Sequence, residues 1–344
     1  MEDILVVTYM EVERMNNNAY VQIKNVSRWY PHKSDKKIID FNKKWIKAVD
    51  QVSLSVNKGE ILGVIGESGC GKSTLGRILA RLEEPTKGDI FINQTSTQKL
   101  IEDNPRKFRR LVQIIFQNPF DTFTPRDTIL EIMTRPLKIH GIGNNKGERY
   151  DIVKKELESG GLYPAEDILR RYPHELSGGQ LQRISILRAM LFDPEFIIAD
   201  EPVSMLDVSV RAEIINMLKK LSKEQDSAVI FISHDIALTR YISDNIAVMY
   251  LGRIVEYGQG DEIIKNPQHP YTKVLISNCP SIDPEEKIMN IKIEGEPPTP
   301  IDPGPGCYFA PRCYKAVDEC YKKYPATEDV GGGHLVACDR LNKK

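Results

Sequence analysis

Hydrophobic and polar positions alternate along the first part of the chain. Residues 20–26 (YVQIKNV) and 48–56 (AVDQVSLSV) place an apolar side chain at nearly every second position, which is the period of a half-buried strand. Residues 31–47 between them are basic and polar, which predicts a long exposed loop. Short apolar runs at residues 60–65 (EILGVI) and 88–92 (GDIFI) predict two further strands.

The pattern then changes to runs that are apolar throughout. Residues 111–116 (LVQIIF), 195–200 (EFIIAD) and 228–233 (AVIFIS) predict interior strands, and residues 210–225 between the last two have a helical period. Residues 245–258 (NIAVMYLGRIVEYG) predict a hairpin. Strands that alternate with helices are typical of a layered α/β core.

Segment boundaries follow from the same pattern. Residues from about 119 to 188 are mostly helical by period, with breaks at 141–147 and 160–163. After Pro280 the composition shifts to Pro, Gly and charged residues, which predicts a boundary. Residues 1–19 are expected to be a disordered extension. They do not resemble a secretory signal, because their short apolar run has acidic flanks and no basic start.

Composition narrows the classes of function. The 344 residues are 41% hydrophobic and 28% charged, which is typical of a globular protein. The net charge of -1 gives no global electrostatic reason to bind nucleic acid or an acidic membrane surface. No apolar run approaches the roughly 18 residues that span a bilayer. A membrane function would therefore need another chain.

A glycine-rich stretch follows the strand expected at residues 60–65. Residues 66–74 (GESGCGKST) fit the pattern G-x-x-x-x-G-K-[ST] and stand before a helix-forming segment. Glycines allow the backbone to fold around a phosphate, and the helix that follows adds the positive end of its dipole. Lys72 is expected to reach the β- and γ-phosphates, and Ser73 to ligate Mg²⁺. The loop residues expected to bind ATP are Gly66, Glu67, Ser68, Gly69, Cys70, Gly71, Lys72, Ser73 and Thr74.

A pair of carboxylates ends the apolar run at residues 195–200. Asp200 is placed to hold Mg²⁺, and Glu201 is placed to polarise the water that attacks the nucleotide. Behind a phosphate loop, an acidic turn of this kind indicates hydrolysis more strongly than it would alone.

A second phosphate-binding shape occurs in the chain. Ser177, Gly178, Gly179 and Gln180 belong to the run LSGGQ and open a helix, so exposed N–H groups would attract an anion. One nucleotide does not need two such loops from one chain, so the simplest use is to cover a nucleotide that another subunit holds. The phosphate loop, LSGGQ, DEP and SHD in this order resemble the ATPase subunit of an ABC transporter.

This resemblance implies the remaining site residues. Gln117 would meet Mg²⁺ and the water, Asp207 would lie across a dimer interface, and His234 would contact the γ-phosphate. Glu201, His234 and Gln117 would then be the catalytic group, and Ser73, Gln117 and Asp200 would hold Mg²⁺. An aromatic residue before the loop would stack on adenine: Tyr30 is favoured, with Trp29 as the alternative.

Four of the six cysteines crowd into the end of the chain. The spacing C-x₅-C-x₆-C-x₁₇-C lacks the short gaps of a zinc finger, and four thiolates suit either zinc or an iron–sulfur cluster. With residues 266–272 (NPQHPYT), this tail resembles the C-terminal extension of oligopeptide and dipeptide ABC ATPases. The resemblance implies a [4Fe-4S] cluster, with zinc and unliganded or paired thiols as alternatives. The ligands would be Cys307, Cys313, Cys320 and Cys338.

The resemblance as a whole implies a fold and a function. The fold would be an α/β ABC ATPase cassette at residues 20–265, with a phosphate-loop core sheet, an antiparallel β subdomain and a helical subdomain at about 119–190. Residues 266–344 would form a small Cys-rich lobe. The chain would hydrolyse ATP to power import of dipeptides or oligopeptides, while nickel chelates and oligosaccharides stay open as cargo.

The implied partners are other proteins and no nucleic acid. They are a second ATPase subunit, two membrane permeases and, indirectly, an extracellular or periplasmic substrate-binding protein. A heterodimer of ATPases is favoured and a homodimer stays open. The chain would act at the cytoplasmic face of the membrane, bound to the permeases. A soluble ABC ATPase of DNA repair or translation is disfavoured, because this chain has one cassette and no coiled-coil insertion.

Overall fold

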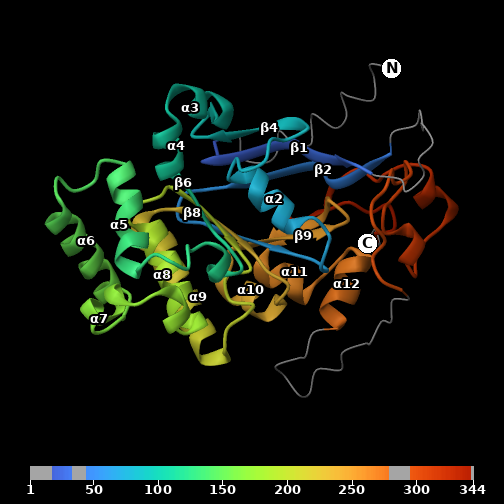
Figure 1. Cartoon of the computed structure of the whole chain (residues 1–344). Helices are drawn as coiled ribbons and strands as arrows, with labels where there is room; N and C mark the ends of the chain where they lie inside the picture. The colour runs from blue at the N-terminus through green and yellow to red at the C-terminus, as the bar shows by residue number, and fades with distance from the viewer. Residues whose placement is uncertain (1–17, 33–43, 279–294, 342–344) are drawn as a thin grey trace, which may run out of the picture.

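A mixed sheet forms the centre of the molecule. The computed structural model describes residues 18–32, 44–278 and 295–341, and within them an eight-stranded sheet has the order β11-β12-β10-β9-β3-β8-β7-β6 (Figure 1). Its neighbouring parallel strands are β9 (Asn245–Tyr250), β3 (Ile61–Ile65), β8 (Ala228–Ile232), β7 (Phe196–Asp200) and β6 (Val112–Ile115). The interior strands expected from the apolar runs are therefore confirmed.

The parallel strands are apolar throughout because both of their faces are covered. In β8, Ile230 and Ile232 pack into the core beside α2 (Lys72–Leu79), whereas Val229 and Phe231 pack into the core beside α9 (Val208–Gln225). This alternation is the period of two of a strand. The helix expected at residues 210–225 is confirmed as α9.

A second, antiparallel sheet covers α2. Its order is β2-β1-β4-β5, formed by β2 (Trp45–Val56), β1 (Val21–Pro31), β4 (Lys87–Ile92) and β5 (Thr95–Ser96). The alternating apolar residues of β1 and β2, such as Val21 and Leu54, enter the same core as Ile78 of α2. Two short helices follow this sheet, α3 (Thr97–Asp103) and α4 (Pro105–Leu111). The strands expected from the alternating pattern are confirmed.

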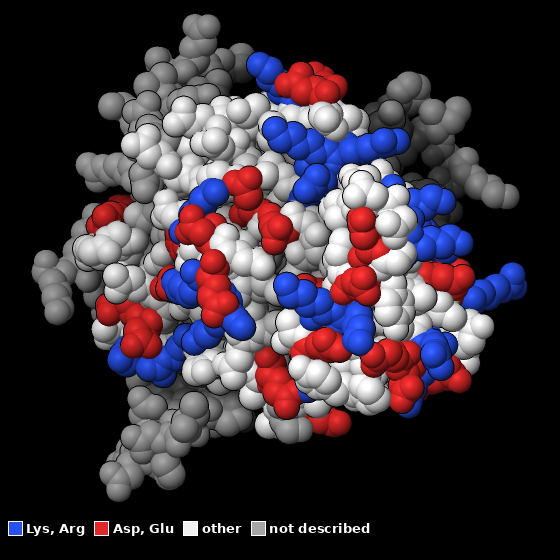
Figure 2. All heavy atoms as spheres, turned by 90° about the vertical axis from the view of Figure 1, so that its left-hand side faces the viewer, with Lys and Arg blue, Asp and Glu red and all other residues white. Residues whose placement is uncertain are grey.

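A group of helices lies at one end of the sheet, at the left of Figure 1. It contains η1 (Pro119–Asp121), α5 (Ile129–Ile139), α6 (Lys146–Ser159), α7 (Ala165–Arg170), η2 (Pro173–Glu175) and α8 (Gly178–Met190). These helices share a hydrophobic core of their own. The expected helical period is confirmed, and so are the two breaks, since α5 ends at Ile139 and α6 ends at Ser159. Figure 2 faces this end of the molecule and shows acidic and basic side chains interspersed.

The other end of the sheet carries the last third of the chain. β9 and β10 (Arg253–Gln259) form the expected hairpin. The elements after β8 are α10 (Ile236–Ile242), α11 (Gly260–Lys265), α12 (Pro270–Ser277), η3 (Ala310–Arg312), η4 (Asp318–Tyr321), β11 (Glu328–Asp329) and β12 (Leu335–Val336).

Residues 295–341 pack against the cassette at several points. β12 pairs with β10 and so extends the main sheet. Ile301 forms a bridge with Ile46 of β2, and Phe309 lies edge-on to Tyr250 of β9 at a ring-centroid distance of 5.2 Å. The change of composition after Pro280 therefore does not separate the tail from the sheet. The extension expected at residues 1–19 lies outside the described residues except for its last two.

Candidate functional site

The glycine-rich loop connects the end of β3 to the start of α2. Gly71 precedes α2 with φ 106°, a left-handed conformation that favours glycine. A Cβ atom at this position would lie 2.0 Å from the carbonyl oxygen of Ala48. The close approach of β2 therefore requires glycine here, at the position where the loop ends and α2 begins.

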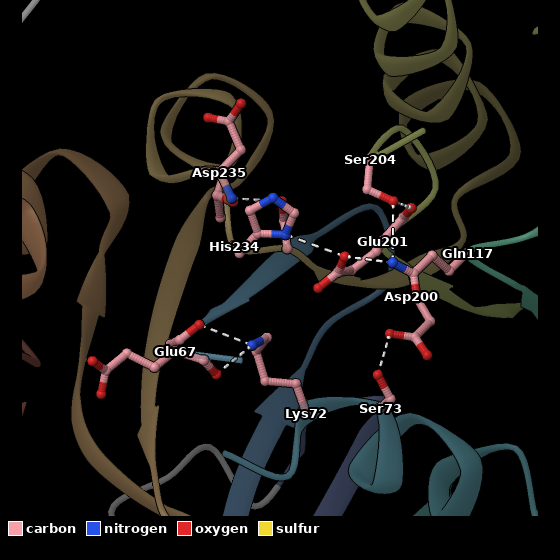
Figure 3. A network of polar contacts seen from close by, with 12 residues as sticks. Glu67, Lys72, Ser73, Gln117, Asp200, Glu201, Ser204, His234 and Asp235 are labelled. Carbon is pink, nitrogen blue, oxygen red and sulfur yellow. Dashed lines mark hydrogen bonds and ion pairs between the residues drawn. The ribbon is translucent and has the colours of Figure 1, made fainter. Parts of the chain in front are cut away.

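The Lys72 side chain lies inside this loop. It is only 5% exposed, and its Nζ donates to the carbonyl oxygens of Gly66 at 2.8 Å and Glu67 at 2.9 Å. A lysine ammonium is a compact charge with three donors. The loop thus surrounds a buried positive charge with backbone groups, as Figure 3 shows.

Ser73 and Asp200 meet beside the lysine. The Ser73 hydroxyl donates to Oδ1 of Asp200 at 3.0 Å, and Asp200 is 6% exposed at the end of β7. Burial raises the pKa of Asp200, against the opposing effect of the hydrogen bond from Ser73. A hydroxyl and a carboxylate are hard oxygen ligands, and a divalent cation between them would remove the cost of burying the carboxylate's charge.

Glu201 is the second carboxylate, and two side-chain nitrogen atoms lie close to one of its oxygens. Gln117 Nε2 donates to Oε2 of Glu201 at 2.9 Å, and His234 Nδ1 lies 3.1 Å from the same oxygen. Gln117 follows β6, Glu201 follows β7 and His234 follows β8. These three residues therefore gather at the carboxyl ends of neighbouring parallel strands, where sites form in α/β sheets (Figure 3).

The backbone at Glu201 is in a strained conformation. Its φ is 47°, which is uncommon for a residue with a side chain. Its N–H donates to the carbonyl oxygen of Ile232 at 2.9 Å. Strain that the surrounding structure maintains is a mark of functional sites.

The run LSGGQ lies apart from this cluster, at the start of α8. Ser177 Oγ accepts from the N–H of Gln180 at 3.3 Å, and Gln180 Oε1 accepts from the N–H of Ser177 at 3.1 Å. Both contacts form a capping box. A hollow of about 200 Å³ adjoins this turn, lined in part by Tyr163 and Arg183. Asp207 is the residue before α9 and makes no side-chain cap there.

The two aromatic candidates for adenine have different surroundings on β1. The Tyr30 hydroxyl donates to Glu83, and the Arg28 guanidinium lies 4.8 Å from the centre of the Tyr30 ring. Trp29 Nε1 donates to Oδ1 of Asp50 at 3.2 Å. The structure thus brings together Lys72, Ser73, Gln117, Asp200, Glu201 and His234, and it places the aromatic pair and the LSGGQ turn outside that cluster.

Sequence reasoning missed two contacts that the tail makes with the phosphate loop. Arg312 donates to the carboxylate of Glu67, and the Tyr271 hydroxyl accepts from the N–H of Glu67. Tyr271 stands in the run NPQHPYT that indicated the family, but no pattern in the sequence connects either residue to position 67.

The prediction of a metal centre in the tail is wrong. Cys307, Cys313, Cys320 and Cys338 share one small cavity, but no group of three or more His, Cys, Asp or Glu side chains in the described ranges could hold a metal ion. Burial raises the pKa of Cys307 to about 11 and also raises those of Cys313 and Cys338. Burial thus disfavours the thiolate form of these three cysteines, which is the form that binds iron or zinc. Neither the [4Fe-4S] cluster nor zinc is supported.

Within the part of the chain that the structure describes, no helix is both long enough and apolar enough to span a membrane.

Comparisons with known proteins agree with this geometry. A family described as ABC transporter matches residues 49–204, and one described as oligopeptide/dipeptide transporter, C-terminal region, matches residues 255–320. The dipeptide transport ATP-binding protein DppF of Haemophilus influenzae is 42% identical over 97% of this chain and 100% of its own length. The oligopeptide transport ATP-binding protein AppF of Bacillus subtilis is 41% identical over 94% and 98%.

Solved structures are similar as well. A dimeric ATP-binding cassette in a post-hydrolysis state, bound to ADP and phosphate, superposes with a TM-score of 0.61 at 31% identity. The match covers 70% of this chain and 98% of the solved cassette. The expected cassette fold is confirmed. From its phosphate loop, its sheet and these relatives, the chain belongs to the ABC transporter ATP-binding proteins that carry the oligopeptide/dipeptide C-terminal region.

Proposed function

We propose that this chain is an ATPase that powers the import of dipeptides and oligopeptides through an ABC transporter. The observation that carries the proposal is that Gln117 and His234 converge on one oxygen of Glu201, in the site that holds the buried Lys72. The names of the dipeptide and oligopeptide transport relatives support the cargo.

The phosphate loop, residues 66–74, binds the phosphates of ATP. Lys72 exchanges its two carbonyl acceptors for oxygens of the β- and γ-phosphates, and the N–H groups at the start of α2 donate to them. The adenine stacks on Tyr30, for which Trp29 is the alternative. On β1, Tyr30 pairs with Ile46 and Trp29 with Lys47 of β2, and the next residue of β2, Ala48, approaches Gly71 of the loop.

The residues beside Lys72 fit Mg²⁺. Ser73 offers a hydroxyl oxygen and Asp200 a carboxylate oxygen, and Gln117 retains its amide oxygen because its nitrogen faces Glu201. Bound Mg²⁺ would neutralise charge on the phosphate oxygens.

Glu201 accepts the proton of the attacking water. Its Oε2 already accepts from Gln117 and faces His234, so its Oε1 is left for the water. His234 is 58% exposed and turns Nδ1 to Glu201, which leaves Nε2 to contact the γ-phosphate. The three residues form the catalytic group.

The second phosphate-binding turn serves a partner's nucleotide. Ser177, Gly178, Gly179 and Gln180 lie at the start of α8, outside the cluster around Lys72, and so offer their N–H groups to a second ATPase subunit. Asp207, before α9, lies at the same interface. A heterodimer is favoured over a homodimer, and the dimeric form of the solved cassette supports a paired arrangement.

The cassette and the C-terminal extension have different roles. Residues 20–265 form the cassette, with a helical subdomain at about 119–190, and residues 266–344 form the C-terminal extension. The helical segment between Phe120 and His174 contacts two membrane permeases. The cassette works at the cytoplasmic face of the membrane through those permeases, and a substrate-binding protein outside the membrane delivers the peptide.

Substituting the proposed base tests the hydrolysis. The Glu201→Gln variant is expected to bind ATP, to remain as a closed dimer with it, and to lose turnover by a factor of about 100 or more. Phosphate release, nucleotide binding and size-exclusion chromatography measure these three properties. The matched control is Glu224→Gln, a carboxylate on exposed α9 surface that pairs with Lys220. Wild-type turnover in Glu201→Gln would remove Glu201 from the mechanism.

Uptake in cells tests the cargo. Cells that lack this chain are expected to lose uptake of labelled dipeptides and tripeptides, and the gene for Glu224→Gln, but not that for Glu201→Gln, should restore it. Undiminished peptide uptake without the chain would contradict the peptide assignment and leave the ATPase assignment standing.

A further inference from the structure

The C-terminal extension contacts the phosphate loop through one ion pair. Arg312 in η3 lies 245 positions from Glu67, the second residue of the loop. Its two terminal nitrogens donate to the two carboxylate oxygens at 2.8 and 3.2 Å. The Arg312 side chain is 8% exposed. Paired donors of this kind fix orientation as well as distance.

A second contact from the extension holds the backbone of the same residue. The hydroxyl oxygen of Tyr271 in α12 accepts from the N–H of Glu67 at 2.9 Å. Tyr271 is fully buried, and its ring packs against those of Tyr250 and Phe309 at centroid distances of 4.6 and 5.4 Å. The hydroxyl is therefore presented from a rigid aromatic cluster.

Arg312 is itself held from several sides. It also donates to the Tyr250 hydroxyl at 3.3 Å and to the carbonyl oxygen of Gly295 at 2.8 Å. The hydrogen bond with Glu67 raises the pKa of Arg312, so the guanidinium stays charged. Among the described residues its buried Nε has no hydrogen-bond partner, and an apolar side chain would fill this place without the cost of burying a charged group. The arrangement therefore points to a use for the charge beyond packing.

Glu67 connects these contacts to the nucleotide site. Its carbonyl oxygen accepts from Lys72 Nζ at 2.9 Å, so the extension holds the N–H and the carboxylate of the residue whose C=O meets the phosphate-binding lysine. The loop contains Gly66, Gly69 and Gly71, all with positive φ, and is therefore costly to order. A loop that is held in shape before binding loses less entropy when a nucleotide arrives.

We propose that Arg312 and Tyr271 are positioning residues through which the C-terminal extension keeps the phosphate loop ready for nucleotide. This inference rests on the ATP-binding function proposed above and adds a role for the extension. Because the loop contacts phosphates that ATP and ADP share, loss of the ion pair should weaken the binding of both nucleotides to the same extent. Turnover at saturation should persist, since Glu201 is untouched.

The first test compares arginine variants of the full-length chain. Arg312→Gln is expected to raise the dissociation constants for ADP and for a non-hydrolysable ATP analogue, with Mg²⁺, by about tenfold. The KM for ATP should rise by the same factor while kcat changes little. Arg312→Lys keeps the charge without the paired geometry, so its dissociation constants should lie between those of the wild type and those of Arg312→Gln. The matched control is Arg240→Gln, which breaks an exposed pair with Asp261 and should bind as the wild type does.

A double-variant cycle separates positioning from general destabilisation. In a Glu67→Gln background, Arg312→Gln should have little further effect on nucleotide binding, because the partner is already neutral. Tyr271→Phe removes only the hydroxyl acceptor and should weaken binding in the same sense with the fold intact.

The outcomes are distinct. The proposal would be overturned if folded Arg312→Gln or Arg312→Lys bound nucleotide with wild-type affinity. It would also be overturned if Arg312→Gln weakened nucleotide binding equally with and without Glu67→Gln. If the wild-type chain itself failed to bind ATP, the proposed function would fall instead.

Discussion

Gln117 donates a hydrogen bond of 2.9 Å to Glu201, although 84 positions separate them in the chain. The contact joins the end of β6 to the end of β7 and fixes the side chain that we propose as the base. We propose that Gln117 positions this base, in addition to offering its amide oxygen to Mg²⁺.

Removing this amide tests the positioning role. Gln117→Leu should lower ATP turnover by about tenfold or more, because an unheld carboxylate spends less time in the reactive position. The affinity for ADP measured without Mg²⁺ should change little. Gln113→Leu, on the same strand β6, is the control and should keep wild-type turnover. Equal turnover in the two variants would show that Gln117 does not position Glu201.

The pH dependence of stability should follow His269. Burial lowers its pKa to about 4, against the raising influence of Glu256, whereas in the unfolded chain it is 6.5. Since only the unfolded chain then binds a proton between these values, stability is lost as the pH falls below 6.5. This residue should make the protein roughly 2 kcal/mol less stable at pH 5 than at pH 7. Urea unfolding at both pH values measures the difference.

A substitution isolates this effect. His269 Nδ1 accepts from the N–H of Tyr271 at the start of α12, and asparagine is a good residue for such a cap. His269→Asn should therefore fold and lose about 2 kcal/mol of the pH dependence. His174→Asn, an exposed histidine outside α12, should keep the full dependence. A slope in His269→Asn as steep as in the wild type would contradict the assignment.

A buried cluster around Asp50 should dominate the attachment of the C-terminal extension. Asp50 Oδ2 accepts from Arg253 at 2.8 Å and from the Tyr308 hydroxyl at 2.7 Å. Burial alone would raise the pKa of Asp50, but the charge of Arg253 holds it below its usual value. Asp50→Leu leaves Arg253 buried and unpaired and should cost about 3–5 kcal/mol of unfolding free energy.

Urea unfolding measures that loss, and Asp261→Leu is its control. Asp261 pairs with Arg240 and Lys265 on the surface, so its loss should leave the unfolding free energy close to that of the wild type. If both variants lost the same stability, the buried cluster would not be the anchor.

The two glycines of LSGGQ should differ in the side chains they tolerate. A Cβ at Gly179 would lie 2.7 Å from Val210 Cγ1, whereas a Cβ at Gly178 would come no closer than 3.9 Å to Leu206. Gly179→Ala should therefore destabilise the fold by about 1–3 kcal/mol, and Gly178→Ala should not. Thermal unfolding compares them. Adding Val210→Ala should restore the Gly179→Ala variant, and failure to do so would locate the strain elsewhere.

The sequence predicted features whose causes are local. The strands of β3 and β8 follow from apolar runs, and the phosphate loop follows from glycines at fixed spacing before Lys72, because adjacent residues alone decide these patterns. The contact of Arg312 with Glu67 could not be predicted, because it depends on how the tail folds back over 245 positions. The cysteine spacing misled because it says nothing of how the four side chains lie in space, and in the described residues they form no group that could hold a metal ion.

The pairing of β12 with β10 means that a truncation of the C-terminal extension would alter the main sheet. Cutting after Lys265 would remove β12, the outer neighbour of β10, and expose unpaired amide and carbonyl groups at that edge of the main sheet. It would also uncover the aromatic surface of Tyr250 that Phe309 shields. An isolated cassette should accordingly be prone to aggregation, because the tail forms one edge of the main sheet and is not a separable domain.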